Sequence, residues 1–338
     1  MTRETRSALI RNIEEERNSR VIVYVTGDRK GLETRIATDI FPFALELLAR
    51  IGKRERLDLF IYSAGGLTMA GYALVNLLRE YAKHLGVIVP FKAHSCATLI
   101  ALGADEIIMT PMAELSPVDP SVASALGPQI TLPGQPFPQT VPVNVEDVAG
   151  YIDLARKELG LKDGKSLAQV LDRLAQSVHP LTLGSVNRIR QQIAFLAETL
   201  LGTHEEDSAK AKKIVETLTK GRFSHDYLIS RHEAKHVLGL NILEPEPPFE
   251  KQIVDLYREY DEMLQLSVPY LAESVLQGGE SARGVFDRAV VESTDASFVF
   301  RTTKDIKRII VGPPASPIPT EAYQEKIISE SWVETDII

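Results

Sequence analysis

Apolar runs of strand length alternate with segments of helical periodicity in the first third of the chain. The runs cover residues 20–25, 57–61 and 86–91, and a fourth begins at residue 106. Between the second and third runs, apolar side chains recur at helical spacing: Leu67, Ala70, Leu74, Leu77, Leu78 and Tyr81. A short helix is predicted for residues 96–102, before the fourth run. This alternation predicts an α/β fold with parallel strands joined by right-handed crossover helices.

The remaining two thirds are predicted to be mainly helical. Five prolines within residues 127–143 favour a surface loop or an edge hairpin. Helices are expected over residues 146–159, 166–176 and 184–201. Prolines in residues 245–248 indicate a linker, and it precedes a helix that ends near residue 266. Strand-like patches follow in residues 289–311.

These patterns predict three parts of the chain. Residues 1–19 form a mixed-charge surface helix, residues 20–244 form the main domain, and residues 245–338 form a C-terminal helix with a small β accessory region. With 338 residues, of which 44% are hydrophobic, the chain can bury one large core and an appendage. We therefore expect one main domain and not a string of small ones.

Charge and cysteine content narrow the class of protein. The 38 Lys and Arg residues against 46 Asp and Glu give a net charge of −8, and no basic stripe occurs. Nucleic acid is therefore not expected as a partner. Cys96 is the single cysteine, which excludes an intramolecular disulfide and favours a reducing compartment. No apolar stretch of about 18 residues and no leader-like h-region occur, so we expect a cytoplasmic protein.

Two loops carry the candidate chemistry. Gly65 and Gly66 follow one predicted strand, and Ser95 follows the next. Active groups in open α/β sheets gather at the carboxyl ends of strands, so these loops are expected to lie together. The backbone amides of Gly66 and Cys96 could then stabilise a developing oxyanion while Ser95 attacks a carbonyl. In the simpler alternative, the glycines form a tight turn and Ser95 caps the short helix.

Cys96 is a second candidate nucleophile. A thiol at the start of a helix can have a lowered pKa and react if it faces the cleft. A lone cysteine is more often a small buried residue. We therefore favour Ser95.

The order of these motifs resembles the ClpP/crotonase superfamily. The segments that carry the resemblance are residues 63–66, residues 93–107, with Asp105 ten residues after Ser95, and residues 115–120. Among its branches the chain is most similar to the serine dehydrogenase proteinase family, a soluble relative of signal-peptide-peptidase-type proteases. Late elements at residues 221–224, 233–234 and 239–240 extend the resemblance to about residue 240.

The resemblance implies a fold, an activity and site residues. The fold would be a repeated β-β-α spiral with helical additions and a small C-terminal appendage. The activity would be ATP-independent hydrolysis of peptides or unfolded proteins, without a cofactor or a metal. Ser95 would be the nucleophile, and the backbone of Gly65, Gly66 and Cys96 would form the oxyanion hole. Relatives form rings or stacked trimers, so a homo-oligomer is expected.

The general base is the least defined part of this hypothesis. Relatives use a downstream lysine or a histidine, and the histidine position falls near Val118, which cannot act as a base. His179, just before Pro180, is our candidate because a histidine has a suitable intrinsic pKa. Three lysines of the same region remain alternatives: Lys157, Lys162 and Lys165. If none of them serves, the protein would be a relative that binds without catalysis.

A zinc site is a rival hypothesis. His232, Glu233 and His236 fit the H-E-x-x-H pattern, which places two histidines one helical turn apart with a glutamate base. Ser230 and Glu233 also fit a capping box, which would occupy the glutamate at the start of the helix. No third histidine follows at the metzincin spacing, and His225 could serve only by folding back. A zinc hydrolase is therefore the weaker alternative.

Two further functions would use the same backbone amides as the predicted oxyanion hole. A crotonase-type acyl-coenzyme A enzyme would stabilise a thioester enolate there, but it would need an adenine pocket and gains nothing from Ser95. A non-catalytic ClpP-like scaffold would serve assembly or regulation. The sequence leaves the natural substrate and the role of residues 245–338 undefined.

Overall fold

The computed structural model describes residues 2–118, 121–122, 124–131, 137–220, 227–311 and 320–335. The chain forms two compact units. The first combines Met1–Leu115 with Ile229–Ile338, and the second is Ser116–Leu228. This division differs from the predicted one, because the C-terminal region belongs to the same unit as the predicted strands that precede Ser95.

A large mixed sheet forms the centre of the first unit. Its strands follow the order β12 (Ile242–Leu243), β5 (Glu106–Met109), β3 (Ala82–Val89), β2 (Arg54–Tyr62), β1 (Arg20–Thr26), β13 (Ser281–Glu292), β14 (Ser297–Val311) and β15 (Thr320–Glu334). The strands from β12 to β1 are parallel, as predicted for all of them except β12, which the sequence pattern did not indicate. The last three are antiparallel, so the fold is a mixed α/β fold. The repeated β-β-α spiral stays a prediction.

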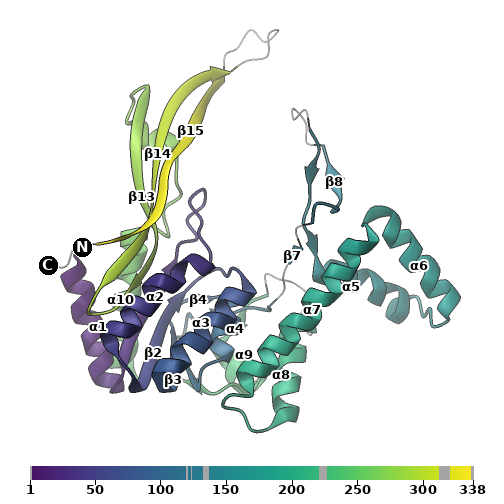
Figure 1. Cartoon of the computed structure of the whole chain (residues 1–338), viewed down its shortest axis with the longest axis horizontal. Helices are drawn as coiled ribbons and strands as arrows, with labels where there is room; N and C mark the ends of the chain where they lie inside the picture. The colour runs from purple at the N-terminus through teal and green to yellow at the C-terminus, as the bar shows by residue number, and fades with distance from the viewer. Residues whose placement is uncertain are drawn as a thin grey trace. The chain divides into compact units, whose positions relative to one another are not determined.

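The C-terminal region extends this sheet and is not an appendage. β13 pairs with β1 over Val23–Thr26, and β14 and β15 continue the sheet outward as long strands (Figure 1). Sequence patterns found only patches here because β13 mixes charged and apolar residues and contains an irregularity between Asp287 and Ala289. Pairing with a strand more than 250 residues earlier is not visible in a local pattern.

Helices cover the sheet. Figure 1 shows α2 (Phe41–Ile51) and α3 (Thr68–Tyr81) in front of it, and α4 (Cys96–Leu102) follows the third parallel strand. On one face, alternate β1 residues such as Val21 and Val23 pack with α1 (Arg3–Arg17) and α10 (Pro247–Leu264). The linker predicted at residues 245–248 is too long, because α10 already begins at Pro247.

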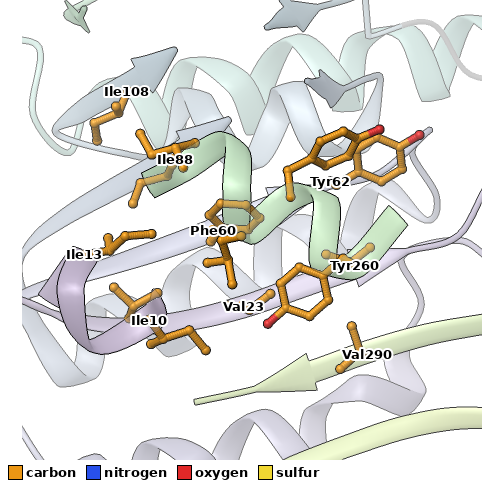
Figure 2. Close-up of a cluster of buried hydrophobic side chains, with 14 of the residues drawn as sticks. Ile10, Ile13, Val23, Phe60, Tyr62, Ile88, Ile108, Tyr260 and Val290 are labelled. Atoms are coloured by element: carbon orange, nitrogen blue, oxygen red, sulfur yellow. The ribbon is translucent and has the colours of Figure 1, made fainter. Parts of the chain in front are cut away.

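The core on the α1 and α10 face is apolar, and the Arg6–Glu292 ion pair is buried beside it. Figure 2 shows Ile10 and Ile13 of α1 beside Phe60, with Tyr260 of α10 close to Val23 and Val290. Arg6 binds Glu292 of β13 through Nε and Nη2, at 2.7 and 3.0 Å, and the Tyr260 hydroxyl donates to the same carboxylate. The predicted surface helix at the amino terminus is therefore docked onto the sheet.

Short elements complete the first unit. A small sheet has the order β11 (Ile229–Ser230), β6 (Glu114–Leu115), β4 (Lys92–Ala93), and β4 and β6 are parallel. The other short elements are a 3-10 helix (Thr38–Ile40), α9 (Arg231–His236) and α11 (Ala272–Leu276). β4 ends two residues before Ser95, the predicted nucleophile.

The second unit is mainly helical. Its helices are α5 (Val145–Asp153), which continues as a π-helix (Leu154–Glu158), α6 (Gly164–Ser177), α7 (Pro180–Leu201) and α8 (Ser208–Lys220). Its strand pairs are β7 (Ser121–Val122) with β10 (Val143–Asn144) and β8 (Gln129–Ile130) with β9 (Gln139–Thr140). The antiparallel β8–β9 pair bears out the hairpin alternative for the proline-rich segment. Within the described ranges, no helix is long and apolar enough to cross a bilayer.

Candidate active site

The glycine loop lies against Ser95. Gly65 has φ of 116°, a conformation that side chains rarely allow. A Cβ atom at Gly65 would lie 3.0 Å from Ser95 Cβ and 3.2 Å from the His94 carbonyl oxygen. Glycine is therefore needed both for the turn and for the close approach of the two loops. The structure brings together Gly65 and Ser95, which the sequence placed at neighbouring strand ends.

Gly66 is fixed by a short stretch of parallel pairing with Ile36. The Ile36 amide donates to the Gly65 carbonyl at 2.9 Å, and the Leu67 amide donates to the Ile36 carbonyl at 2.8 Å. A Cβ at Gly66 would overlap the backbone of Ile36, so no larger residue fits. In the described part of the chain, the Gly66 amide has no acceptor. This donor is available to a ligand. The predicted Gly65 donor is not, because the Gly65 amide already donates to Ser63 Oγ at 3.0 Å.

Ser95 occupies a strained position. Its φ of 50° and ψ of −110° lie outside the ordinary regions for a residue with a side chain, at a cost on the order of 1–3 kcal/mol. Ser95 stands at the N-cap position of α4, but its side chain makes no capping hydrogen bond. The capping alternative is therefore wrong. The residue is half-buried at the turn between β4 and α4.

The Cys96 amide is the second available donor. The Ala97 amide donates to the His94 carbonyl and the Leu99 amide to the Ser95 carbonyl. Among the described residues no acceptor is found for the Cys96 amide, which begins α4. A fixed amide next to Ser95 thus accompanies the Gly66 amide on the neighbouring loop.

The Cys96 side chain points away from this chemistry. Its Sγ lies 3.2 Å from the Leu67 carbonyl oxygen, and the side chain is fully buried. Burial raises the pKa of the thiol to about 12, so hardly any thiolate forms near neutral pH. The hypothesis of Cys96 as nucleophile is wrong, and the predicted small buried residue is what the structure shows.

His94, the neighbour of Ser95, belongs to the small sheet. Its Nε2 lies 3.0 Å from Glu114 Oε1 of β6. Burial lowers the pKa of His94, and the Glu114 carboxylate opposes this shift without reversing it. His94 is thus held toward β6.

The candidate bases lie in the second unit, whereas Ser95 lies in the first. His179 is the N-cap of α7, where its Nδ1 accepts a hydrogen bond from the Leu181 amide at 3.2 Å. Lys157 forms an exposed ion pair with Asp153 at 2.7 Å. Lys162 and Lys165 are also exposed. The structure brings none of the four together with Ser95 in one unit, so the identity of the base stays a prediction.

The H-E-x-x-H segment forms a capped helix. Ser230 Oγ accepts a hydrogen bond from the Glu233 amide at 3.3 Å, which confirms the predicted start of α9. The rings of His232 and His236 lie 4.7 Å apart, one turn from each other. Over the described ranges, no third metal-binding side chain joins this pair. His225 lies outside the described residues.

Comparison with known proteins finds a family similarity over the first part of the chain. Residues 1–132 match the family model of the ClpP-like SDH-type serine proteinases. The resemblance inferred from the motifs is confirmed over these residues, and its extension to residue 240 stays a prediction. The matched segment contains Gly65, Gly66, Ser95 and Cys96. His179 lies beyond it.

Two similar proteins align with about three quarters of the chain. Two uncharacterized proteins of Methanocaldococcus jannaschii, MJ0137 and MJ1495, are 27% and 28% identical over 262 and 260 residues. These alignments cover 75% and 73% of this chain, and 79% and 75% of the relatives. A solved structure, the 1510-N membrane-bound stomatin-specific protease, aligns with 73% of this chain and 86% of its own at 14% identity and a TM-score of 0.38.

Sequence reasoning missed three residues that shape the glycine loop. Ile36 pairs with Gly66, and the buried hydroxyls of Thr26 and Ser63 lie directly beneath Gly65. The role of Ser63 is predictable from the sequence, because a serine two residues before a glycine can form a hydrogen bond with the backbone of its own turn. Ile36 and Thr26 could not be found in this way, because both act through contacts far along the chain.

Proposed function

We propose that this protein is an ATP-independent serine peptidase with Ser95 as its nucleophile. The Ser95 oxygen attacks the carbonyl carbon of a peptide bond and transfers its proton to a general base. The C–N bond then breaks, and the leaving amine takes that proton. Water hydrolyses the Ser95 ester, which releases the carboxylic acid and restores the hydroxyl. Gly66 and Cys96 donate their amides to the negative oxygen of each tetrahedral intermediate.

One observation carries this proposal: a strained serine lies beside two backbone amides that have no acceptor in the described part of the chain. Strain at a single non-glycine residue is retained where the surrounding structure holds it, and such positions cluster at functional sites. Unsatisfied amides are uncommon in folded proteins, and here both belong to segments adjoining Ser95. A match to a serine proteinase family over the same residues supports this role.

The proposed oxyanion hole is rigid before substrate binds. Gly66 is fixed by Ile36, and Cys96 is fixed by the first turn of α4. Amides held in place need no reorganisation when charge develops, and removal of one such donor typically costs about 10²–10³ in turnover. The hole therefore supplies a large part of the proposed rate enhancement, while the base activates the serine.

His179 is our proposed base, and peptides or unfolded proteins are the proposed substrates. While Nδ1 accepts the Leu181 amide, the neutral ring carries its proton on Nε2, so His179 accepts the serine proton only after this capping bond is released. We also propose a homo-oligomer. Sedimentation of the purified protein as a single monomeric species at micromolar concentration would contradict that part alone.

A fluorophosphonate probe tests the nucleophile. The probe should add to the wild-type protein at one residue, detected by intact mass and peptide mapping, and Ser95→Ala should abolish labelling. Ser274→Ala is the matched control, because Ser274 is an exposed serine on α11. Labelling unchanged by a chelator argues against the zinc hydrolase. No labelling of the folded wild-type protein, or equal labelling of Ser95→Ala, would overturn the proposal.

A further inference from the structure

The peptide between Gly65 and Gly66 is held by the buried hydroxyl of Ser63, which the buried hydroxyl of Thr26 supports in turn. Ser63 Oγ accepts a hydrogen bond from the Gly65 amide at 3.0 Å and donates to the Gly65 carbonyl at 3.3 Å. Thr26 Oγ1, at the end of β1, donates to the same Ser63 oxygen at 2.7 Å. Ser63 and Thr26 are 0% and 1% exposed, so water does not compete for these bonds.

These contacts use the full bonding capacity of the Ser63 hydroxyl. A serine hydroxyl has one proton and two lone pairs. The proton goes to the Gly65 carbonyl, and the lone pairs accept from the Gly65 amide and from Thr26. Ser63 therefore has a single well-defined orientation, which Thr26 helps to set from a neighbouring strand.

Peptide planarity passes this orientation on to the Gly66 amide. The Gly65 carbonyl and the Gly66 N–H belong to one trans peptide unit and point in opposite directions. The carbonyl is held by Ser63 and by the Ile36 amide at 2.9 Å. The Gly66 N–H is consequently fixed on the side away from these two groups. Glycine backbones rotate easily, so without such bonds this peptide could turn and the donor would be lost.

We infer that Ser63 and Thr26 are positioning residues of the peptidase, which lock the Gly65–Gly66 peptide so that the Gly66 amide is presented to the substrate oxyanion. The inference rests on the proposed function, because it assigns these residues to the same oxyanion hole. Neither residue touches the substrate. Their effect is therefore exerted on the transition state through Gly66, and not on the binding of the ground state.

Two variants with matched controls test the inference. Ser63→Ala removes the central hydroxyl and should slow acylation of Ser95 by about 10–100-fold, less than complete loss of an oxyanion donor. Thr26→Val keeps the shape of the side chain and should slow acylation several-fold, and Thr26→Ser should restore most of the rate. Thr110→Val is the control for loss of a buried hydroxyl, because Thr110 Oγ1 bonds the Pro90 carbonyl at 2.7 Å, in a separate contact.

The decisive readout compares two reversible ligands of the same peptide sequence. A peptide aldehyde adds to Ser95 and places an oxyanion in the hole, whereas the corresponding peptide alcohol binds without that charge. Ser63→Ala should weaken the aldehyde at least tenfold more than the alcohol. Circular dichroism and the thermal midpoint verify that each variant is folded. A merely structural role would weaken both ligands equally.

The outcomes separate this inference from the proposed function. If the wild-type protein is not labelled at Ser95, the peptidase proposal fails and the inference fails with it. If the wild-type protein is labelled, but folded Ser63→Ala and Thr26→Val acylate at the wild-type rate, the inference alone is overturned. Equal loss of aldehyde and alcohol binding in Ser63→Ala would also overturn it.

Discussion

At the scale of single residues, Gly65 is a position where the site tolerates little change. Gly65→Ala would force a side chain into φ of 116° and place its Cβ 3.0 Å from that of Ser95. We expect acylation of Ser95 to fall at least 100-fold, because the serine and the Gly66 amide would both shift. Labelling kinetics on protein of verified fold measure this. Gly184→Ala, in an exposed turn of α7 with open space around it, should label normally and be slightly more stable. Normal labelling of Gly65→Ala would contradict the assigned geometry.

Cys96 gives a prediction about pH at the same scale. Burial raises the pKa of its thiol to about 12, so at pH 8 its thiolate fraction is about a thousandfold below that of an unfolded cysteine. Iodoacetamide should therefore alkylate Cys96 slowly in the native protein and readily in urea, as followed by intact mass. Because the folded state retains this proton longer, Cys96 lowers stability as pH rises above the unfolded thiol pKa, near 8.5. Rapid native alkylation at pH 8 would show the thiol to be exposed.

At the scale of elements, the Arg6–Glu292 pair joins α1 to β13. The two side chains are only 6% and 2% exposed, and desolvation alone would lower the pKa of Arg6, but Glu292 raises it above its usual value. Arg6→Met should lower the free energy of unfolding, measured in urea, by about 3–5 kcal/mol, because it leaves the Glu292 charge buried without a partner. Adding Glu292→Gln should recover much of this loss. Arg283→Met, which breaks an exposed pair with Asp305, should have no measurable effect. If Arg6→Met and Arg283→Met lowered the free energy of unfolding by similar amounts, the distinction between the buried and the exposed ion pair would be wrong.

Elements also differ in how far the sequence predicts them. The strand, turn and helix units up to Met109 were predictable because each carries its own signal, an apolar run followed by glycine or serine and then helical spacing. The predicted short helix at residues 96–102 matches α4. β13 was missed because its burial depends on β1 and on an ion pair with Arg6. In the candidate site, the glycines and Ser95 lie together as expected, whereas the supporting Thr26 is distant in sequence.

At the scale of the whole molecule, the proposed base can be tested separately from the proposed nucleophile. Ser95 and the two amides lie in the first unit, and His179 lies in the second. If His179 is the base, His179→Ala should slow fluorophosphonate labelling by about 10²–10⁴, the usual contribution of general-base catalysis. The physical reason is that a neutral serine hydroxyl is a weak nucleophile until a base accepts its proton.

His179→Asn and the lysine variants make this test specific. The asparagine amide would retain an acceptor for capping α7 but could not act as a base, so His179→Asn should remain as stable as the wild type and lose the labelling rate. Lys157→Ala, Lys162→Ala and Lys165→Ala should label normally, because these side chains are exposed and Lys157 is paired with Asp153. If one lysine variant loses the labelling rate while His179→Asn keeps it, that lysine is the base. Ser95 would remain the nucleophile in either case.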